Sequence, residues 1–422
     1  MTQAITDAYF GGREAFYAKL VTLGLLPSVC PQGHGPVSFQ FVGDRHFPKV
    51  YCSVCRSKIT SYRSGTVFGV FDIKKCPAFL FILQSFVMGA SMQLMSRLSG
   101  LGPTTTRMYV DYIRTVMIDH SQLMYQRWEG DLGGPGKVVE VDEVFVVKRK
   151  FHVGKRLAKE ELVVFGLTER DGGPVQVTDQ ALYTYLVEKE RYKERKALER
   201  KLRRRRVRAA QAPASCGAVD DGQTTEIALN EARLQGTSSS APVTFSFDTV
   251  MERKERELFG PGKKTRPRRT MFFIVPDRSR ETLVGIINRF VKPHSVVFSD
   301  GWKGYETLPG YEHYVVIHAE RFVKYAFLDN YFVVKVTTNH IEREWVELRK
   351  YIHGLSPEDV SDRLFEITYR LFRLSTGNPD DDLVNMCNDI RDYCKRQTDP
   401  EMPPSAFVPS QAGHLVGGPL WG

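Results

Sequence analysis

Cysteine is scarce in this chain, with seven among 422 residues. An odd number cannot all pair within one chain, and the spacing of Cys30, Cys52 and Cys55 is typical of metal ligands rather than of a disulfide framework. Disulfide-rich domains belong to oxidising compartments, so we expect reduced thiols in a reducing one. No pairing is suggested by the other four: Cys76, Cys216, Cys387 and Cys394.

Hydrophobic targeting signals are also absent. Residues 1–8 contain no basic region followed by an apolar one, which predicts no secretory signal. A spanning helix needs about 20 predominantly apolar residues. The best candidate, Ala78–Met95, is interrupted by Gln84, Ser85, Gly89, Ser91 and Gln93. We therefore predict a buried helix that Pro77 opens and no membrane partner.

Acidic residues are fewer than basic ones, 49 against 59, which gives a net charge of +10. Residues 188–208 alone hold 12 Lys/Arg and 4 Glu, a local charge of +8 (12 − 4). This balance favours a polyanionic partner. The charge lies mainly in one segment, so it says little about the rest of the chain.

Three acidic residues have distinctive settings. Asp142 lies inside the apolar run Val138–Val147, Asp300 follows a second apolar run, and Glu342 lies at the start of a helix predicted over His340–His353. An unpaired carboxylate in a buried strand costs several kcal/mol. If these three converge, they can hold the hard divalent cations that phosphoryl transfer on DNA or RNA requires.

Alternatives exist at each position. Glu140 shares a strand face with Asp142 and is its nearest rival as a metal ligand, whereas Glu143 faces the other way and is a weaker one. Asp300 can simply initiate a turn. An edge strand is the alternative for the first run, with its acids in solvent or paired with Lys148, Arg149 and Lys150.

Glu342 can also complete a capping box with Asn339 as the N-cap. The helix has a core-facing apolar stripe, and Glu342 lies one position beside it, where it can reach the sheet. Glu344 and Glu347 lie further round the helix and are weaker candidates for the third metal ligand. The stripe consists of Ile341, Trp345, Leu348 and Ile352.

Two motifs before these acids predict DNA-recognition modules. The pairs Cys30-x3-His34 and Cys52-x2-Cys55 suit a structural Zn²⁺ in a zinc ribbon, with His46 as a substitute for His34 and four unrelated residues as the alternative. Met92–Leu98 and Pro103–Met117, joined by Gly100-Leu-Gly102, resemble a helix-turn-helix, or else a purely packed helical pair. The residues expected to contact DNA are Arg107, Arg114, Lys148, Arg149, Lys150, Arg203, Arg204, Arg205 and Arg206.

Five segments in this order resemble the DDE core of Merlin-superfamily transposases and their bacterial insertion-sequence relatives. They are Val139–Glu143, Val275–Ser279, Phe298–Tyr305, Val316–Phe322 and Asn339–Trp345. The resemblance spans residues 25–355 apart from one insertion. It implies an RNase H-like domain in which Asp142, Asp300 and Glu342 bind two Mg²⁺ or Mn²⁺ ions.

The chain departs from the family in two places. Residues 175–270 form an insertion, and the 42 positions from Asp300 to Glu342 (342 − 300) exceed the usual spacing. Some bacterial relatives use a different third residue, so Asn339 is an alternative ligand. The resemblance also gives His318 a possible role beside its plainer interpretation as a strand histidine.

We therefore expect a mixed α/β chain, with strands over Met271–Val275 and Ser295–Ser299 and helices over Tyr183–Arg208 and Arg280–Phe290. Its parts are an N-terminal helix (1–24), a zinc ribbon (25–66), a helix-turn-helix-like DNA-binding region (67–130), an RNase H-like catalytic domain (137–355) with a basic, partly disordered insertion, C-terminal helices (356–396) and a disordered tail (397–422).

The predicted function is a DNA transposase that binds terminal inverted repeats, then cleaves and joins double-stranded DNA as a homodimer or larger assembly. The alternatives are a host-retained, transposon-derived DNA-binding protein without catalysis and an RNase H-like nuclease. Basic clusters at 201–206 and 263–269 predict a nuclear location in a eukaryote, and the cytoplasm or nucleoid otherwise.

Overall fold

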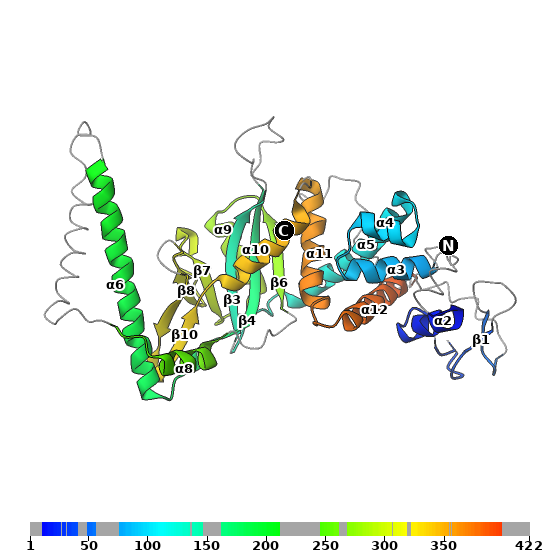
Figure 1. Cartoon of the computed structure of the whole chain (residues 1–422), viewed down its shortest axis with the longest axis horizontal. Coiled ribbons are helices and arrows are strands. Elements are labelled where there is room, and N and C mark those ends of the chain that lie inside the picture. Colours follow the sequence, from blue (N-terminus) through cyan, green and yellow to red (C-terminus); the bar gives the residue numbers. More distant parts are fainter. Residues whose placement is uncertain are drawn as a thin grey trace.

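The structure is a computed structural model (Figure 1). It describes residues 11–26, 28–30, 32–40, 49–55, 76–135, 137–146, 162–211, 245–260, 268–305, 307–318, 322–353, 355 and 357–398. The predicted tail from residue 399 onward therefore lies outside the described residues, as do residues 1–10 of the predicted N-terminal helix.

A five-stranded mixed sheet forms the centre of the molecule. Its order is β6-β4-β3-β7-β8. β3 pairs antiparallel with β4, which pairs antiparallel with β6, whereas β7 and β8 run parallel to β3. This arrangement is consistent with the expected RNase H-like domain. The strands are β3 (Lys137–Phe145), β4 (Val163–Asp171), β6 (Thr270–Val275), β7 (Val296–Asp300) and β8 (Glu312–Val316).

Helices cover both faces of this sheet, which explains why its strands are nearly continuous apolar runs. On one face, Val139 and Val141 belong to a core shared with α5 (Pro103–Trp128) and α9 (Arg280–Phe290). On the other, Val144 packs with α10 (Asn339–Ile352) and α11 (Pro357–Arg373). Side chains that alternate along β3 thus enter two different cores.

At one end of the sheet, α5 forms a body with α2 (Arg13–Thr22), α3 (Cys76–Val87), α4 (Met92–Ser99) and α12 (Pro379–Thr398) (Figure 1). One core includes residues of α2, α3, α5 and α12. The predicted buried helix is therefore α3, and no helix within the described ranges is long and apolar enough to cross a bilayer. A small hairpin of β1 (Ser38–Gln40) and β2 (Lys49–Tyr51) lies beyond α2.

The two predicted helices of the helix-turn-helix are present. Ser91 caps α4 (Met92–Ser99) by accepting a 3.2 Å hydrogen bond from the Leu94 N–H, and Gly100 ends it in a left-handed conformation at φ 65°. The second helix, α5, begins at Pro103 as predicted but continues to Trp128, eleven residues beyond the predicted end (128 − 117).

A second, smaller sheet with order β5-β10-β9 lies beside the first. We call its strands together with two helices the accessory unit. The basic stretch predicted to be helical lies in one of them, α6, whereas β9 and β10 were not predicted. The members are β5 (Val175–Gln176), α6 (Gln180–Gln211), α8 (Thr249–Phe259), β9 (Lys324–Phe327) and β10 (Phe332–Val336).

Most predicted elements around the three acids are confirmed within a residue or two. The helix over Arg280–Phe290 has the predicted bounds, and the strand predicted over Ser295–Ser299 is β7. One expectation is wrong: β8 ends at Val316, so His318 is not a strand histidine. Short 3-10 turns follow β7 and β9, at Lys303–Tyr305 and Asp329–Tyr331.

Candidate active site and metal sites

The two predicted aspartate ligands lie on neighbouring parallel strands. Glu140 of β3 is level with Phe298 of β7, and Asp142 and Asp300 each lie two residues further along these strands. One carboxylate oxygen from each of Asp142, Glu143 and Asp300 lies within 4.8 Å of the other two. This acidic group has the hard oxygen ligands that Mg²⁺ and Mn²⁺ prefer.

Asp142 is held by α10, which covers the face of the sheet that Asp142 shares with Val144. The indole Nε1–H of Trp345 donates to Oδ2 at 2.7 Å. Burial, together with the charges of Asp300 and Glu143, raises the pKa of Asp142 to about 7. A nearby cation would therefore strongly favour its ionised form. The sequence assigned Trp345 only to the apolar stripe, so this hydrogen bond was not anticipated.

Gly166 makes that contact possible. It pairs with Asp142 across β3 and β4, and α10 lies directly over it. A Cβ at this position would lie 2.5 Å from Cη2 of Trp345 and 2.8 Å from Cδ1 of Ile341. The missing side chain allows the indole to lie against β4 and reach the aspartate.

Glu143 joins the acidic group although its strand position faces the opposite core. Tyr305 donates its hydroxyl to Oε2 at 2.8 Å, and Arg278 donates from Nε to Oε1 at 2.9 Å. Burial raises the pKa of Glu143, and these two partners oppose that rise. The guanidinium of Arg278 lies 5.4 Å from the centre of the Trp302 ring. Arg278 belongs to the segment Val275–Ser279, which carried a family resemblance but no assigned role.

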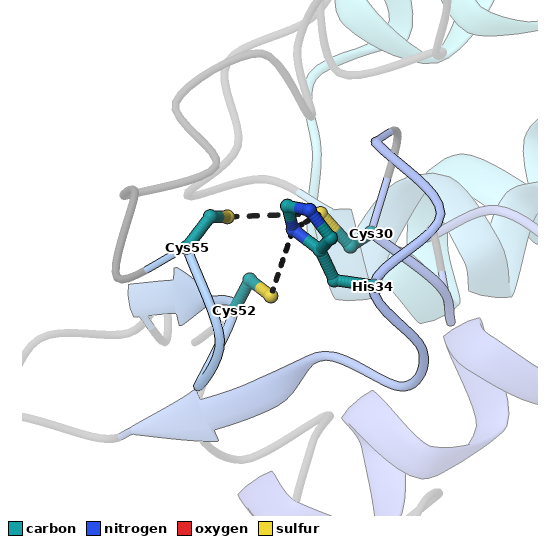
Figure 2. Close-up of side chains that lie close together, drawn as sticks. All are labelled: Cys30, His34, Cys52 and Cys55. Atoms are coloured by element: carbon teal, nitrogen blue, oxygen red, sulfur yellow. Dashed lines mark hydrogen bonds between the residues drawn. The ribbon is translucent and has the colours of Figure 1, made fainter.

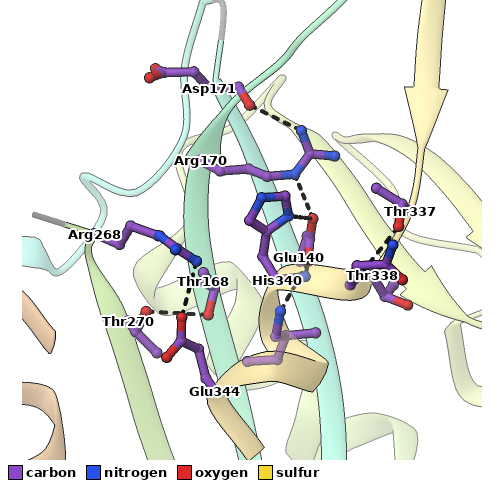
Figure 3. A network of polar contacts seen from close by, with 12 residues as sticks. Glu140, Thr168, Arg170, Asp171, Arg268, Thr270, Thr337, Thr338, His340 and Glu344 are labelled. Carbon is purple, nitrogen blue, oxygen red and sulfur yellow. Dashed lines mark hydrogen bonds and ion pairs between the residues drawn. The ribbon is translucent and has the colours of Figure 1, made fainter. Parts of the chain in front are cut away.

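Glu140, the rival ligand, is instead fully buried in a separate network (Figure 3). It pairs with Arg170, and its Oε1 lies 2.9 Å from Nδ1 of His340. Its Oε2 accepts the backbone N–H groups of His340 at 2.8 Å and Ile341 at 3.0 Å. Although burial alone would raise the pKa of Glu140, His340 and Arg170 hold it below its usual value.

This network replaces the predicted capping box. Asn339 is the first residue of α10 rather than its N-cap, and Thr338 in the N-cap position makes no side-chain cap hydrogen bond. The carboxylate of Glu140 supplies the missing acceptor from the strand. Because Glu140 and α10 are 200 residues apart in sequence, local pattern reasoning selected the wrong cap.

Glu342, the predicted third acid, lies in the first turn of α10 but outside the acidic group. Its Oε1 is 2.9 Å from Nε2 of His318, and the same nitrogen is 2.8 Å from the hydroxyl of Thr338. More than a third of the Glu342 side chain is exposed. The structure thus places the predicted third acid and the predicted histidine in contact with each other.

The other acids of α10 have different partners. Glu344 is buried and pairs with Arg268 at 3.1 Å, near Thr270 of β6 (Figure 3). Glu347 pairs with Lys350 of the same helix at 2.7 Å. Of the three, Glu342 belongs to the turn nearest Glu140, at the end of the helix that meets β3.

The four predicted zinc ligands come together near β1 and β2 (Figure 2). The Sγ atom of Cys30 lies 3.8 Å from Nδ1 of His34 and 3.9 Å from Sγ of Cys55, and Sγ of Cys52 lies 4.0 Å from the same nitrogen. Ligands at tetrahedral corners around one Zn²⁺ are about 3.5–3.8 Å apart. This Cys₃His cluster fits such an ion. His46, the substitute ligand, lies outside the described residues.

Local backbone geometry prepares the first pair of this cluster. The N–H of Cys30 donates to the carbonyl of Gly35 at 2.9 Å, and the N–H of Gly33 donates to the carbonyl of Cys30 at 2.9 Å. Gly33 and Gly35 have φ values of 76° and 97°, which glycine adopts without strain. The loop therefore curls so that His34 returns towards Cys30.

The predicted DNA-contacting residues have varied settings. Arg107 is exposed at the start of α5, whereas Arg114 is largely covered and pairs with Glu366 of α11 at 3.1 Å. Its charge thus contributes to packing between two helices. The remaining predictions are Arg203, Arg204, Arg205 and Arg206, which lie on α6, and Lys148, Arg149 and Lys150, which lie outside the described residues.

In a comparison with known families, residues 231–370 match the ISXO2-like transposase domain. These residues include Asp300 and Glu342, and β3 with Asp142 precedes them. No match was found among curated proteins or among solved structures. The chain therefore carries a DDE transposase domain, an enzyme domain of catalytic phosphoryl transfer. Such a domain implies a transposase function and binding to DNA.

Proposed function

We propose that this protein binds the terminal inverted repeats of a mobile element and carries out metal-dependent DNA cleavage followed by strand transfer. The observation that carries the proposal is the acidic group formed by Asp142 and Asp300 on adjacent parallel strands. The transposase-domain match over residues 231–370 supports it.

Two divalent ions fit the chemistry of these residues. Closely spaced carboxylates repel one another, and the raised pKa of Asp142 reflects that repulsion together with burial. Asp142, Asp300 and Glu342 would hold the ions. When bound, Mg²⁺ or Mn²⁺ activates a water or a 3′-hydroxyl and stabilises the leaving oxygen of an in-line displacement.

The surrounding residues position these ligands. Trp345 fixes the carboxylate of Asp142, and Glu140 ties the start of α10 to β3. Tyr305 and Arg278 fix Glu143 beside the two aspartates. In this proposal Glu342 completes the ligand set once its carboxylate leaves His318.

The remaining modules are assigned to end recognition. We infer that the Cys₃His cluster holds a structural Zn²⁺ and that α4 and α5 present a helix-turn-helix to duplex DNA. Because each element has two ends, a homodimer or larger assembly would hold both of them. Arg107 at the exposed start of α5 would contact the backbone of the end.

The test is Mg²⁺- or Mn²⁺-dependent cleavage and joining of DNA that carries candidate element ends. Wild type should cleave and join, and Glu342→Gln should lose at least about a hundredfold in rate, because a neutral amide is a poor ligand for a hard cation. Normal activity in Glu342→Gln would move the third ligand to Asn339 or to Glu143, which already belongs to the acidic group.

End binding by the same proteins provides the control, since Glu342→Gln should bind ends as wild type does. Wild type that binds ends without cleaving them would instead favour a retained DNA-binding protein.

A further inference from the structure

Two segments that are far apart in the sequence form one structural unit. β5, α6 and α8 precede β6, whereas β9 and β10 lie between Asp300 and Glu342. β10 pairs with both β5 and β9. A shared core joins the two parts: Val177, Leu182, Tyr185, Leu186, Phe259, Tyr325 and Val333.

Charged side chains reinforce this accessory unit where α6 begins. The buried Lys189 of α6 pairs with Glu255 of α8 at 2.5 Å, and Glu255 also accepts the hydroxyl of Tyr325 at 2.7 Å. Lys335 of β10 donates to the carbonyl of Phe259 at 2.9 Å. The first half of α6 is therefore held by partners from both parts of the unit.

The accessory unit is also anchored to the catalytic sheet. Val334 and Val336 of β10 share a core with Val138 of β3 and with Val296 and Phe298 of β7. β10 then leads through two threonines into α10. α6 is thus attached firmly to the domain that carries the acidic group.

The outer half of α6 is strongly basic. Residues 193–206 contain nine Lys/Arg and two Glu, a net charge of +7 (9 − 2), over a helical length of about 20 Å. With two Glu among nine Lys/Arg, the segment itself is strongly positive. Arg203 and Arg204 are exposed, and Figure 1 shows α6 extending away from the sheet.

We propose that this outer half of α6 is a second DNA-binding surface, which holds the phosphate backbone of duplex DNA outside the element ends without reading its sequence. Arginine and lysine neutralise phosphates in this way. Residues 193–206 contain no aromatic side chain on which unpaired bases would stack, which favours a duplex over a single strand. The inference rests on the proposed function only for the identity of the polyanion as DNA.

The test compares three full-length proteins on a labelled random-sequence duplex over a range of salt concentrations. Arg203, Arg204, Arg205 and Arg206 are replaced together by Gln in one variant and by Lys in a matched control, since all three residue types favour helices. The Gln variant should bind at least tenfold more weakly at about 0.1 M salt, with a salt slope shallower by about 3 to 4. The Lys control should resemble wild type.

An unchanged salt slope in the Gln variant, with helix content equal to that of wild type by circular dichroism, would overturn the proposal. Weakened binding to a single strand with duplex binding intact would overturn it as well. Metal-dependent cleavage of end-bearing DNA is measured with the same preparations. Absence of cleavage in wild type, with the expected loss of duplex binding in the Gln variant, would refute the transposase proposal and leave this inference standing.

Discussion

At the scale of single residues, the fold opposes the ionisation of Asp142. Its pKa is raised to about 7 from a reference near 3.8. Between these values the folded protein binds more protons than the unfolded chain, so this group makes stability fall as pH rises from about 4 to 7. The ionised carboxylate therefore destabilises the folded protein when no metal ion is bound.

Replacing Asp142 with Asn should stabilise the protein in buffer without Mg²⁺ or Mn²⁺. We expect a gain of about 1–4 kcal/mol at pH 8, which shrinks towards pH 4, because the amide carries no charge to desolvate. Urea unfolding at several pH values measures it. The exposed Asp329→Asn is the control and should change little.

The same Asp142→Asn variant should lose DNA cleavage while it still binds DNA. A variant no more stable than wild type at pH 8 would contradict the raised pKa, whereas normal cleavage would contradict the assignment of Asp142 as a ligand.

At the scale of elements, the contact between α10 and β4 depends on the absence of one side chain. Gly166→Ala would place a methyl group against Trp345 and Ile341. Such overpacking costs about 1–3 kcal/mol, and a shift of α10 would also move Glu342. We expect reduced stability in urea and loss of cleavage.

Gly102→Ala is the matched control for this substitution. Gly102 is the N-cap of α5, with φ −62° and open space where a Cβ would lie, so alanine there meets no neighbouring side chain and should cost only about 0.5 kcal/mol, because alanine is a poorer N-cap residue than glycine. Equal effects of the two substitutions on unfolding would show that Gly166 has no special packing role.

The sequence predicted the positions of helices and strands better than it predicted the contacts between side chains of different elements. Periodic apolar residues located α9, β6, β7 and α10 because each pattern is local. The cap of α10 by Glu140 and the contact of Glu342 with His318 join residues from separate elements. Strand alternation assigned Glu143 to the opposite face, yet the ends of β3 and β7 bring it beside Asp300. β9 and β10, which are four and five residues long, were not predicted, although β10 is as long as β7.

At the scale of the whole molecule, the Cys₃His cluster joins residues from two separate parts of the chain, Cys30 and His34 on one side and Cys52 and Cys55 on the other. Cys52→Ser should reduce bound zinc below one ion per chain and lower the affinity for element ends, because metal binding supplies folding energy to such modules. Zinc content and end binding measure the two effects. Cys216→Ser is the control, since this cysteine has no metal-like spacing. Unchanged zinc content in Cys52→Ser would contradict the site.

The helical body is assembled from both sides of the catalytic domain. α3 and α5 precede the sheet, whereas α11 and α12 follow it, and the ion pairs Arg114–Glu366 and Arg396–Asp119 join the two groups. During synthesis on the ribosome, more than 200 residues are added after α5 before α11 and α12 emerge. Premature termination within the catalytic domain would therefore release an incompletely packed helical region, open to proteolysis, rather than a stable DNA-binding fragment that competes for element ends.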